Sequence, residues 1–88
     1  MDEIVTQRFI RNVTALARDR GVGRMETECG VKQGYLRRAE LSKTRGISMI
    51  TALRMARWLG YSLEDLTTKE IWKEKRLAEI SEELKTLS

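Results

Sequence analysis

The chain has 88 residues, a net charge of +4, and 41% hydrophobic against 34% charged residues. This length allows one domain, or one domain with an appendage, and the apolar content is too high for a disordered chain. The sequence contains no apolar run of membrane-spanning length, and its single cysteine cannot form an internal disulfide. We therefore expect a cytoplasmic protein without a signal peptide and without membrane association.

The first half of the chain predicts three helices. Apolar residues recur at helical spacing from Val5 to Leu16, which predicts a helix over about 2–20 that ends at Gly21. A second, short helix is expected over 24–29, followed by a turn at Gly30, because glycine adopts the left-handed conformation of such turns at little cost. The apolar stripe of the first helix consists of Val5, Phe9, Ile10, Val13 and Leu16.

A third helix is expected from about Gln33 to Leu41. At 100° per residue its core-facing side contains Lys32, Leu36 and Ala39. Tyr35 and Glu40 flank the two edges. The opposite, outward arc consists of Gln33, Gly34, Arg37, Arg38 and Leu41.

After a loop over 42–46, Ser48 is expected to cap a fourth helix that ends at Gly60. Ser62 can cap a short fifth helix that buries Leu63 and Leu66. Thr67 and Glu70 have capping-box spacing, which predicts that a last helix starts at Thr67. The core stripe of the fourth helix is expected to consist of Met49, Ala52, Leu53, Ala56 and Leu59.

The last helix is expected to run close to the end of the chain, to be anchored by Ile71 or Trp72, and to present an apolar seam of two heptads on one side. We expect this seam to form a homodimer. The alternative is that the seam folds back onto the first helix and the protein stays monomeric. The candidate dimerisation residues are Trp72, Leu77, Ile80, Leu84 and Leu87.

Positive charge is concentrated in the middle of the chain. Residues 32–57 contain seven basic residues against one acidic residue, Glu40, whereas residues 67–88 contain five of each. Clustered positive charge is typical of proteins that bind phosphate backbones. The seven residues are Lys32, Arg37, Arg38, Lys43, Arg45, Arg54 and Arg57. Of these, Arg54 and Arg57 are the weaker candidates, because they fit a solvated helix face.

Residues 22–40 (VGRMETECGVKQGYLRRAE) have the outline of two short helices joined by a tight turn. This stretch, with Gly30-Val31, Leu36 and Glu40, and the tail over 56–66 (ARWLGYSLEDL) resemble the lambda-repressor/Cro-like helix-turn-helix family, also called the xenobiotic-response-element family. The resemblance covers about residues 6–66. Glu26 departs from it, since that family usually has a small residue there, and Lys32 replaces a usual Ser or Thr.

The resemblance implies an all-α, five-helix DNA-binding domain over 1–66, with an extra C-terminal amphipathic helix over 67–88. It implies a sequence-specific transcriptional regulator that reads the major groove of double-stranded DNA with the third helix. It places Gln33 and Arg37 at base-reading positions, where glutamine pairs with adenine and arginine with guanine. We assign base contacts to Gln33, Gly34, Arg37 and Arg38, and DNA-backbone contacts to Lys32, Tyr35, Lys43, Thr44 and Arg45.

Several of these residues have a second, purely structural interpretation. Gly34 either lets the backbone approach DNA closely or relaxes the turn, and Tyr35 either binds a phosphate or packs with a polar tip. We expect Glu40 to pair with a nearby arginine and Cys29 to be a small buried thiol. Trp58 and Trp72 are expected to be packing residues.

Catalysis is not expected, because the chain has no histidine to activate its cysteine and no cluster with metal-ligand spacing. We also expect no cofactor. Two other functions remain open. One is an antitoxin-like or other protein-interaction module of the same fold, whose last helix holds a partner protein. The other is a helical scaffold without a nucleic-acid role.

Overall fold

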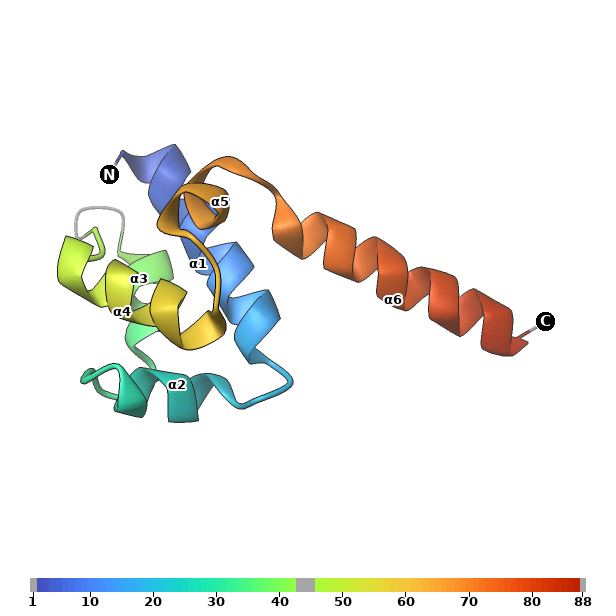
Figure 1. The fold of residues 1–88 in the computed structure, drawn as a ribbon, viewed down its shortest axis with the longest axis horizontal. Coiled ribbons are helices and arrows are strands. Elements are labelled where there is room, and N and C mark those ends of the chain that lie inside the picture. Colours follow the sequence, from blue (N-terminus) through green and yellow to red (C-terminus); the bar gives the residue numbers. More distant parts are fainter. Residues whose placement is uncertain (1, 43–45, 88) are drawn as a thin grey trace.

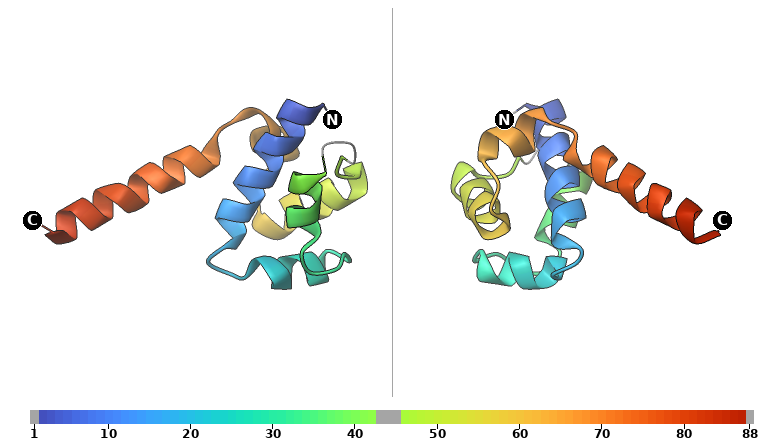
Figure 2. Two further views of the ribbon diagram at one scale, coloured as in Figure 1. Left: turned by 180° about the vertical axis from the view of Figure 1, so that it is seen from behind. Right: turned by 45° about the vertical axis from the view of Figure 1, so that its right-hand side comes forward.

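The computed structural model describes residues 2–42 and 46–87. Within these residues the fold consists of six helices and contains no strand, which confirms the predicted all-α class. Helices α1 to α5 pack into one body, and α6 projects from it, so that the molecule measures 45 × 25 × 24 Å (Figures 1 and 2). The helices are α1 (Glu3–Ala17), α2 (Val22–Glu28), α3 (Tyr35–Leu41), α4 (Met49–Leu59), α5 (Leu63–Thr68) and α6 (Ile71–Leu87).

Local side-chain caps start three helices, α1, α4 and α5. The predicted end of the first helix near residue 20 is wrong because α1 ends at Ala17, and α2 begins at Val22, earlier than predicted. The carboxylate of Asp2 accepts a hydrogen bond from the backbone N–H of Val5 at 2.8 Å and starts α1. The hydroxyls of Ser48 and Ser62 likewise start α4 and α5, which confirms both predicted caps. Gly60 ends α4 with a φ of 77°, the left-handed conformation that glycine adopts without strain.

The core lies between α1 and the four helices packed on it. Phe9, Ile10 and Val13 are buried, which confirms the central part of the predicted stripe of α1. In α4 the predicted stripe is partly wrong, because Met49 and Leu53 are 55% and 48% exposed. The buried face of α4 consists of Thr51, Ala52, Met55 and Ala56.

The rotation of α4 has a physical cause in the residues before it. Ile47 is buried and fixes how the chain enters the helix. Thr51 then faces inward, and its hydroxyl accepts a hydrogen bond from the Ser48 hydroxyl at 2.8 Å, so burying it leaves no polar atom unsatisfied. Since apolar residues occupy more than one side of α4, periodicity alone could not select the buried one.

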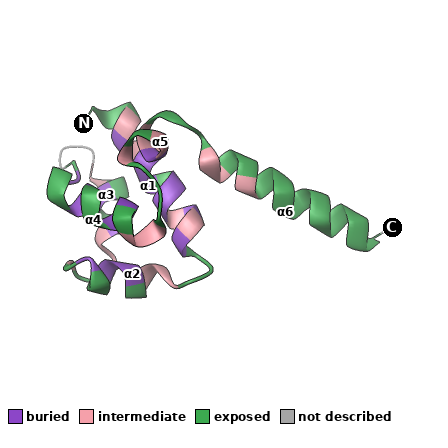
Figure 3. Cartoon of the chain, in the orientation of Figure 1, coloured by how far each residue is buried: buried purple, intermediate pink, exposed green. Residues whose placement is uncertain are grey.

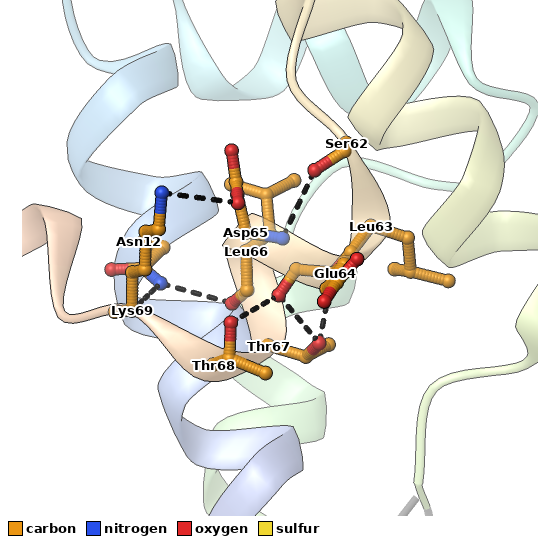
Figure 4. Close-up of polar contacts among 9 residues, drawn as sticks. All are labelled: Asn12, Ser62, Leu63, Glu64, Asp65, Leu66, Thr67, Thr68 and Lys69. Carbon is orange, nitrogen blue, oxygen red and sulfur yellow. Dashed lines mark hydrogen bonds and ion pairs between the residues drawn. The ribbon is translucent and has the colours of Figure 1, made fainter.

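The predicted capping box at Thr67 and Glu70 is wrong. Thr67 lies inside α5, where its hydroxyl donates to the carbonyl oxygens of Leu63 and Glu64, and α6 begins at Ile71 (Figure 4). The first turn of α6 is capped instead by Asn12 of α1, whose Oδ1 accepts from the backbone N–H of Trp72 at 3.0 Å. The start of α6 is therefore capped by a residue 60 positions away, not by the neighbouring pair that the sequence motif predicted.

Asn12 is fully buried and connects three helices. Its Nδ2 donates to the carbonyl oxygens of Leu66 at 2.9 Å and Lys69 at 2.7 Å (Figure 4). Together with the bond from Trp72, these contacts satisfy the amide and join α1, the end of α5 and the start of α6. Asn12 therefore helps to fix the direction in which α6 leaves the body.

Candidate nucleic-acid interface

The predicted turn between α2 and α3 is present. Gly30 has a φ of 84°, and the backbone N–H of Val31 donates to the carbonyl oxygen of Glu26 at 3.0 Å. This bond and the left-handed conformation of Gly30 end α2 and turn the chain toward α3. Cys29, just before the turn, is buried as expected, and burial raises the pKa of its thiol.

α3 begins two residues later than the sequence predicts. Gly34 has a φ of 88°, in the left-handed region, so Gln33 and Gly34 precede the helix. Lys32 also lies before it and is exposed, so its predicted core-facing position is wrong. A spacing of 100° per residue does not apply to Lys32, because the left-handed Gly34 separates it from the helix. Within the helix the prediction is confirmed, since Leu36 and Ala39 are buried.

Glu26 fixes the start of α3. Its side chain is only 2% exposed, and its two carboxylate oxygens accept from the backbone N–H groups of Gly34 at 3.0 Å and Leu36 at 2.8 Å. Gly34 has no side chain with which to cap the helix, so a carboxylate from α2 takes the position of the cap. The negative charge also lies at the positive end of the α3 dipole.

Glu26, which replaces the small residue usual in the resembled family, therefore has a structural role that the sequence interpretation missed. The available signal was the coincidence of a glutamate in α2 with an uncapped glycine eight residues later. α3 is held against α2 by two hydrogen bonds to a buried charge, in addition to apolar packing.

Three of the four predicted base-contacting residues, Gln33, Gly34 and Arg38, lie close together at the start of α3. Nη1 of Arg38 donates to the carbonyl oxygen of Gln33 at 3.1 Å. A Cβ on Gly34 would lie 2.9 Å from the same nitrogen, so a side chain there would displace the guanidinium. The side chain of Gln33 lies against Gly23 of α2. The left-handed conformation of Gly34 therefore favours glycine, whereas the exposed guanidinium of Arg38 can move aside for a side chain.

Arg37 differs from this group. It is exposed on the outward face of α3, and among the described residues it forms no ion pair. Tyr35 is half-buried against the core, in agreement with the packing interpretation. Lys43, Thr44 and Arg45 lie outside the described residues. Glu40 is exposed, and in the described part of the chain it forms no ion pair with an arginine.

A second polar cluster fixes α2 against α4. The indole N–H of Trp58 donates to Oε2 of Glu28 at 2.8 Å, and the guanidinium of Arg20 stacks on the Trp58 ring at 3.6 Å. Arg20 also donates to the Trp58 carbonyl oxygen at 3.0 Å. Trp58 is therefore a packing residue, as expected, although its partners were not identified from the sequence.

Helix α6 is anchored to the body through its first turns. Ile71 packs on the core, while Trp72 lies against α1, with Arg11 5.4 Å from its ring centroid. Lys75 donates to the carbonyl oxygen of Ala15 and pairs with Asp19 at 3.1 Å. Further along, α6 is exposed (Figure 3), and its four seam residues do not fold back onto α1. They are Leu77, Ile80, Leu84 and Leu87.

No helix in the described ranges is long and apolar enough to cross a membrane. No protein-family model matches the chain, and no match was found among curated proteins or solved structures.

Proposed function

We propose that the protein is a sequence-specific, non-enzymatic DNA-binding regulator of the lambda-repressor-like type, with α3 in the major groove. The observation that carries the proposal is a rigidly held short helix with exposed arginines. Arg37 and Arg38 project from α3, whose position is fixed on α2 by the Gly30 turn and the buried carboxylate of Glu26. We also include in the proposal the cytoplasmic location expected from the sequence.

Arg37 is the residue best suited to read a base. It is exposed and unpaired among the described residues, so its guanidinium is available for the bidentate contact with guanine O6 and N7. Arg38 is already bonded to the Gln33 carbonyl, which keeps its charge at the start of α3. In this position Arg38 suits a phosphate or a base next to the one that Arg37 reads.

Preorganisation of α3 supports the same function. Binding costs less conformational entropy when the contacting helix is already fixed before DNA arrives. Two bonds to Glu26 and the buried side chains of Leu36 and Ala39 fix it. The basic residues around α3 then supply the sequence-independent attraction to phosphates.

The decisive experiment is selection of binding sites from random duplexes, followed by salt titration on the selected site. We expect one enriched sequence and a log–log salt slope of about −0.9 for each phosphate neutralised. Binding without an enriched sequence would remove sequence-specific regulation from the proposal. A slope near zero would remove DNA binding itself.

A homodimer completes the proposal, because two-fold proteins match two-fold operators. The exposed seam on α6 is the proposed contact. The same exposed seam is also the observation that favours the second candidate, an antitoxin-like module whose α6 holds a different protein. Co-purification of a stoichiometric, stable second protein with the full chain would favour that candidate.

A further inference from the structure

α6 has an apolar side without a partner among the described residues of its own chain. Leu77, Ile80, Leu84 and Leu87 are 67%, 39%, 61% and 84% exposed. Their spacings of three, four and three residues place them at heptad positions a, d, a and d. The helix is already positioned by its contacts with Asn12 and Ala15, so it loses little conformational entropy when a second helix packs on it.

We propose that α6 of a second copy covers this seam in the antiparallel direction, with the two-fold axis between Ala78 and Glu79. The proposal rests on the dimer proposed above and specifies how its subunits meet. In this register Leu77 faces Ile80 of the second copy, and Leu84 faces Lys73 of the second copy. The two contacts next to the axis, Leu77 of each copy with Ile80 of the other, are then formed by large apolar side chains.

Charge along α6 favours this direction. The first half of the helix has three basic residues and one acidic residue, and the second half has the reverse. Antiparallel pairing brings opposite signs together, whereas parallel pairing brings like signs together. Arg76 and Glu83 flank the seam on the same side, and neither forms an ion pair within the described chain. The axis between Ala78 and Glu79 brings each Arg76 beside Glu83 of the other copy.

Lys73 provides an independent argument against the parallel direction. It precedes Ile80 by one heptad, so a parallel pair would place two Lys73 side chains opposite each other in the seam. In the antiparallel pair its methylene stem faces Leu84 of the second copy. Its ammonium group is held at the end of the seam by Glu70, at 2.8 Å.

The surface beside the start of α6 can receive the end of the second helix. A groove of about 550 Å³ adjoins the seam at Leu77. The proposed register places the last turn of the second α6, with Leu84 and Leu87, over this groove. It is lined by Arg8, Lys69, Glu70, Lys73, Glu74 and Leu77, together with Thr68.

Disulfide trapping in the full chain tests the direction. We expect L84C alone to remain uncross-linked, because its two copies lie at opposite ends of an antiparallel pair, beyond disulfide reach. An equimolar mixture of L84C and K73C should give the mixed disulfide. The native Cys29 is buried and serves as the unreactive internal reference. Cross-linking of L84C with itself would show a parallel pair and overturn the proposal.

Charge reversal gives a second arm. R76E and E83R should each weaken dimerisation about tenfold in sedimentation equilibrium, and the double variant R76E/E83R should restore it. E82R is the matched control, because Glu82 lies on the side of α6 opposite the seam, and it should change the dimer Kd less than twofold. A full-length monomer would overturn the dimer proposal. Specific DNA binding by that monomer would leave the proposed DNA-binding function standing.

Discussion

The body formed by α1 to α5 and the projecting helix α6 are stabilised in different ways. In the body, buried polar side chains join separate helices: Asn12 bonds residues far along the chain, and Glu26 joins α2 to the start of α3. No described residue of α6 is buried, and beyond the first turns the ion pair between Lys85 and Glu82 links residues of the same helix. The body therefore specifies one tertiary structure, whereas α6 has a fixed starting direction and an apolar face that requires another surface.

The largest expected effect breaks the junction between these two regions. Asn12→Ala leaves the carbonyl oxygens of Leu66 and Lys69 and the N–H of Trp72 without their partner. We expect the free energy of unfolding to fall by about 3 kcal/mol, since each unsatisfied buried group costs roughly 1–3 kcal/mol. Urea denaturation monitored by circular dichroism measures this. A loss below about 0.5 kcal/mol would show that the junction does not depend on Asn12.

Glu26→Ala should have the next largest effect. It removes the acceptor from the backbone N–H groups of Gly34 and Leu36, which costs about 2 kcal/mol of stability. DNA affinity should fall as well, because α3 is no longer fixed before binding. The matched control is Glu64→Ala, an exposed glutamate of α5 whose side chain forms no ion pair among the described residues. Equal DNA affinities for the two variants would contradict the positioning role of Glu26.

Arg37→Ala should act on binding and leave folding intact. We expect a loss of about 1–3 kcal/mol on the selected DNA site and little change on random DNA. Arg57→Ala, on an exposed position of α4, is the control and should change stability and specificity little. Fluorescence anisotropy with both duplexes measures the difference. An equal loss on specific and random DNA would show that Arg37 binds phosphate only.

Lys43→Ala should weaken binding to every DNA sequence by a similar factor. If Lys43 contacts a phosphate, its loss should reduce the log–log salt slope by about one. The salt titration is repeated with the variant, and Arg57→Ala again provides the comparison. An unchanged slope would remove Lys43 from the interface.

The smallest expected effect concerns α6 itself. Leu84→Ala removes an exposed side chain, so the stability of the monomeric form should change by less than about 0.5 kcal/mol. The dimer should be weakened clearly under the same conditions. Denaturation at protein concentrations below and above the dimer Kd separates the two effects. A large loss at the lowest concentration would place Leu84 in the core of its own chain.

Local features of the sequence were sufficient for much of the fold. The caps at Ser48 and Ser62, the turn at Gly30 and the stop at Gly60 depend on a few adjacent residues, and each is present. The order of the helices and the burial of Phe9, Val13 and Leu66 also follow from short-range periodicity. Of the candidate site, the exposed Arg37 and Arg38 and the exposed seam of α6 were predicted in this way.

Only the tertiary structure decided the contacts between distant residues. Glu26 as the cap of α3, Asn12 as the cap of α6 and the rotation of α4 toward Met55 each depend on which elements meet in space. A sequence motif cannot specify them, because a backbone N–H at a helix start can donate to any suitably placed oxygen, near or far along the chain. Thr67 shows the reverse case, since its capping-box spacing was correct while its hydroxyl was already bonded within α5.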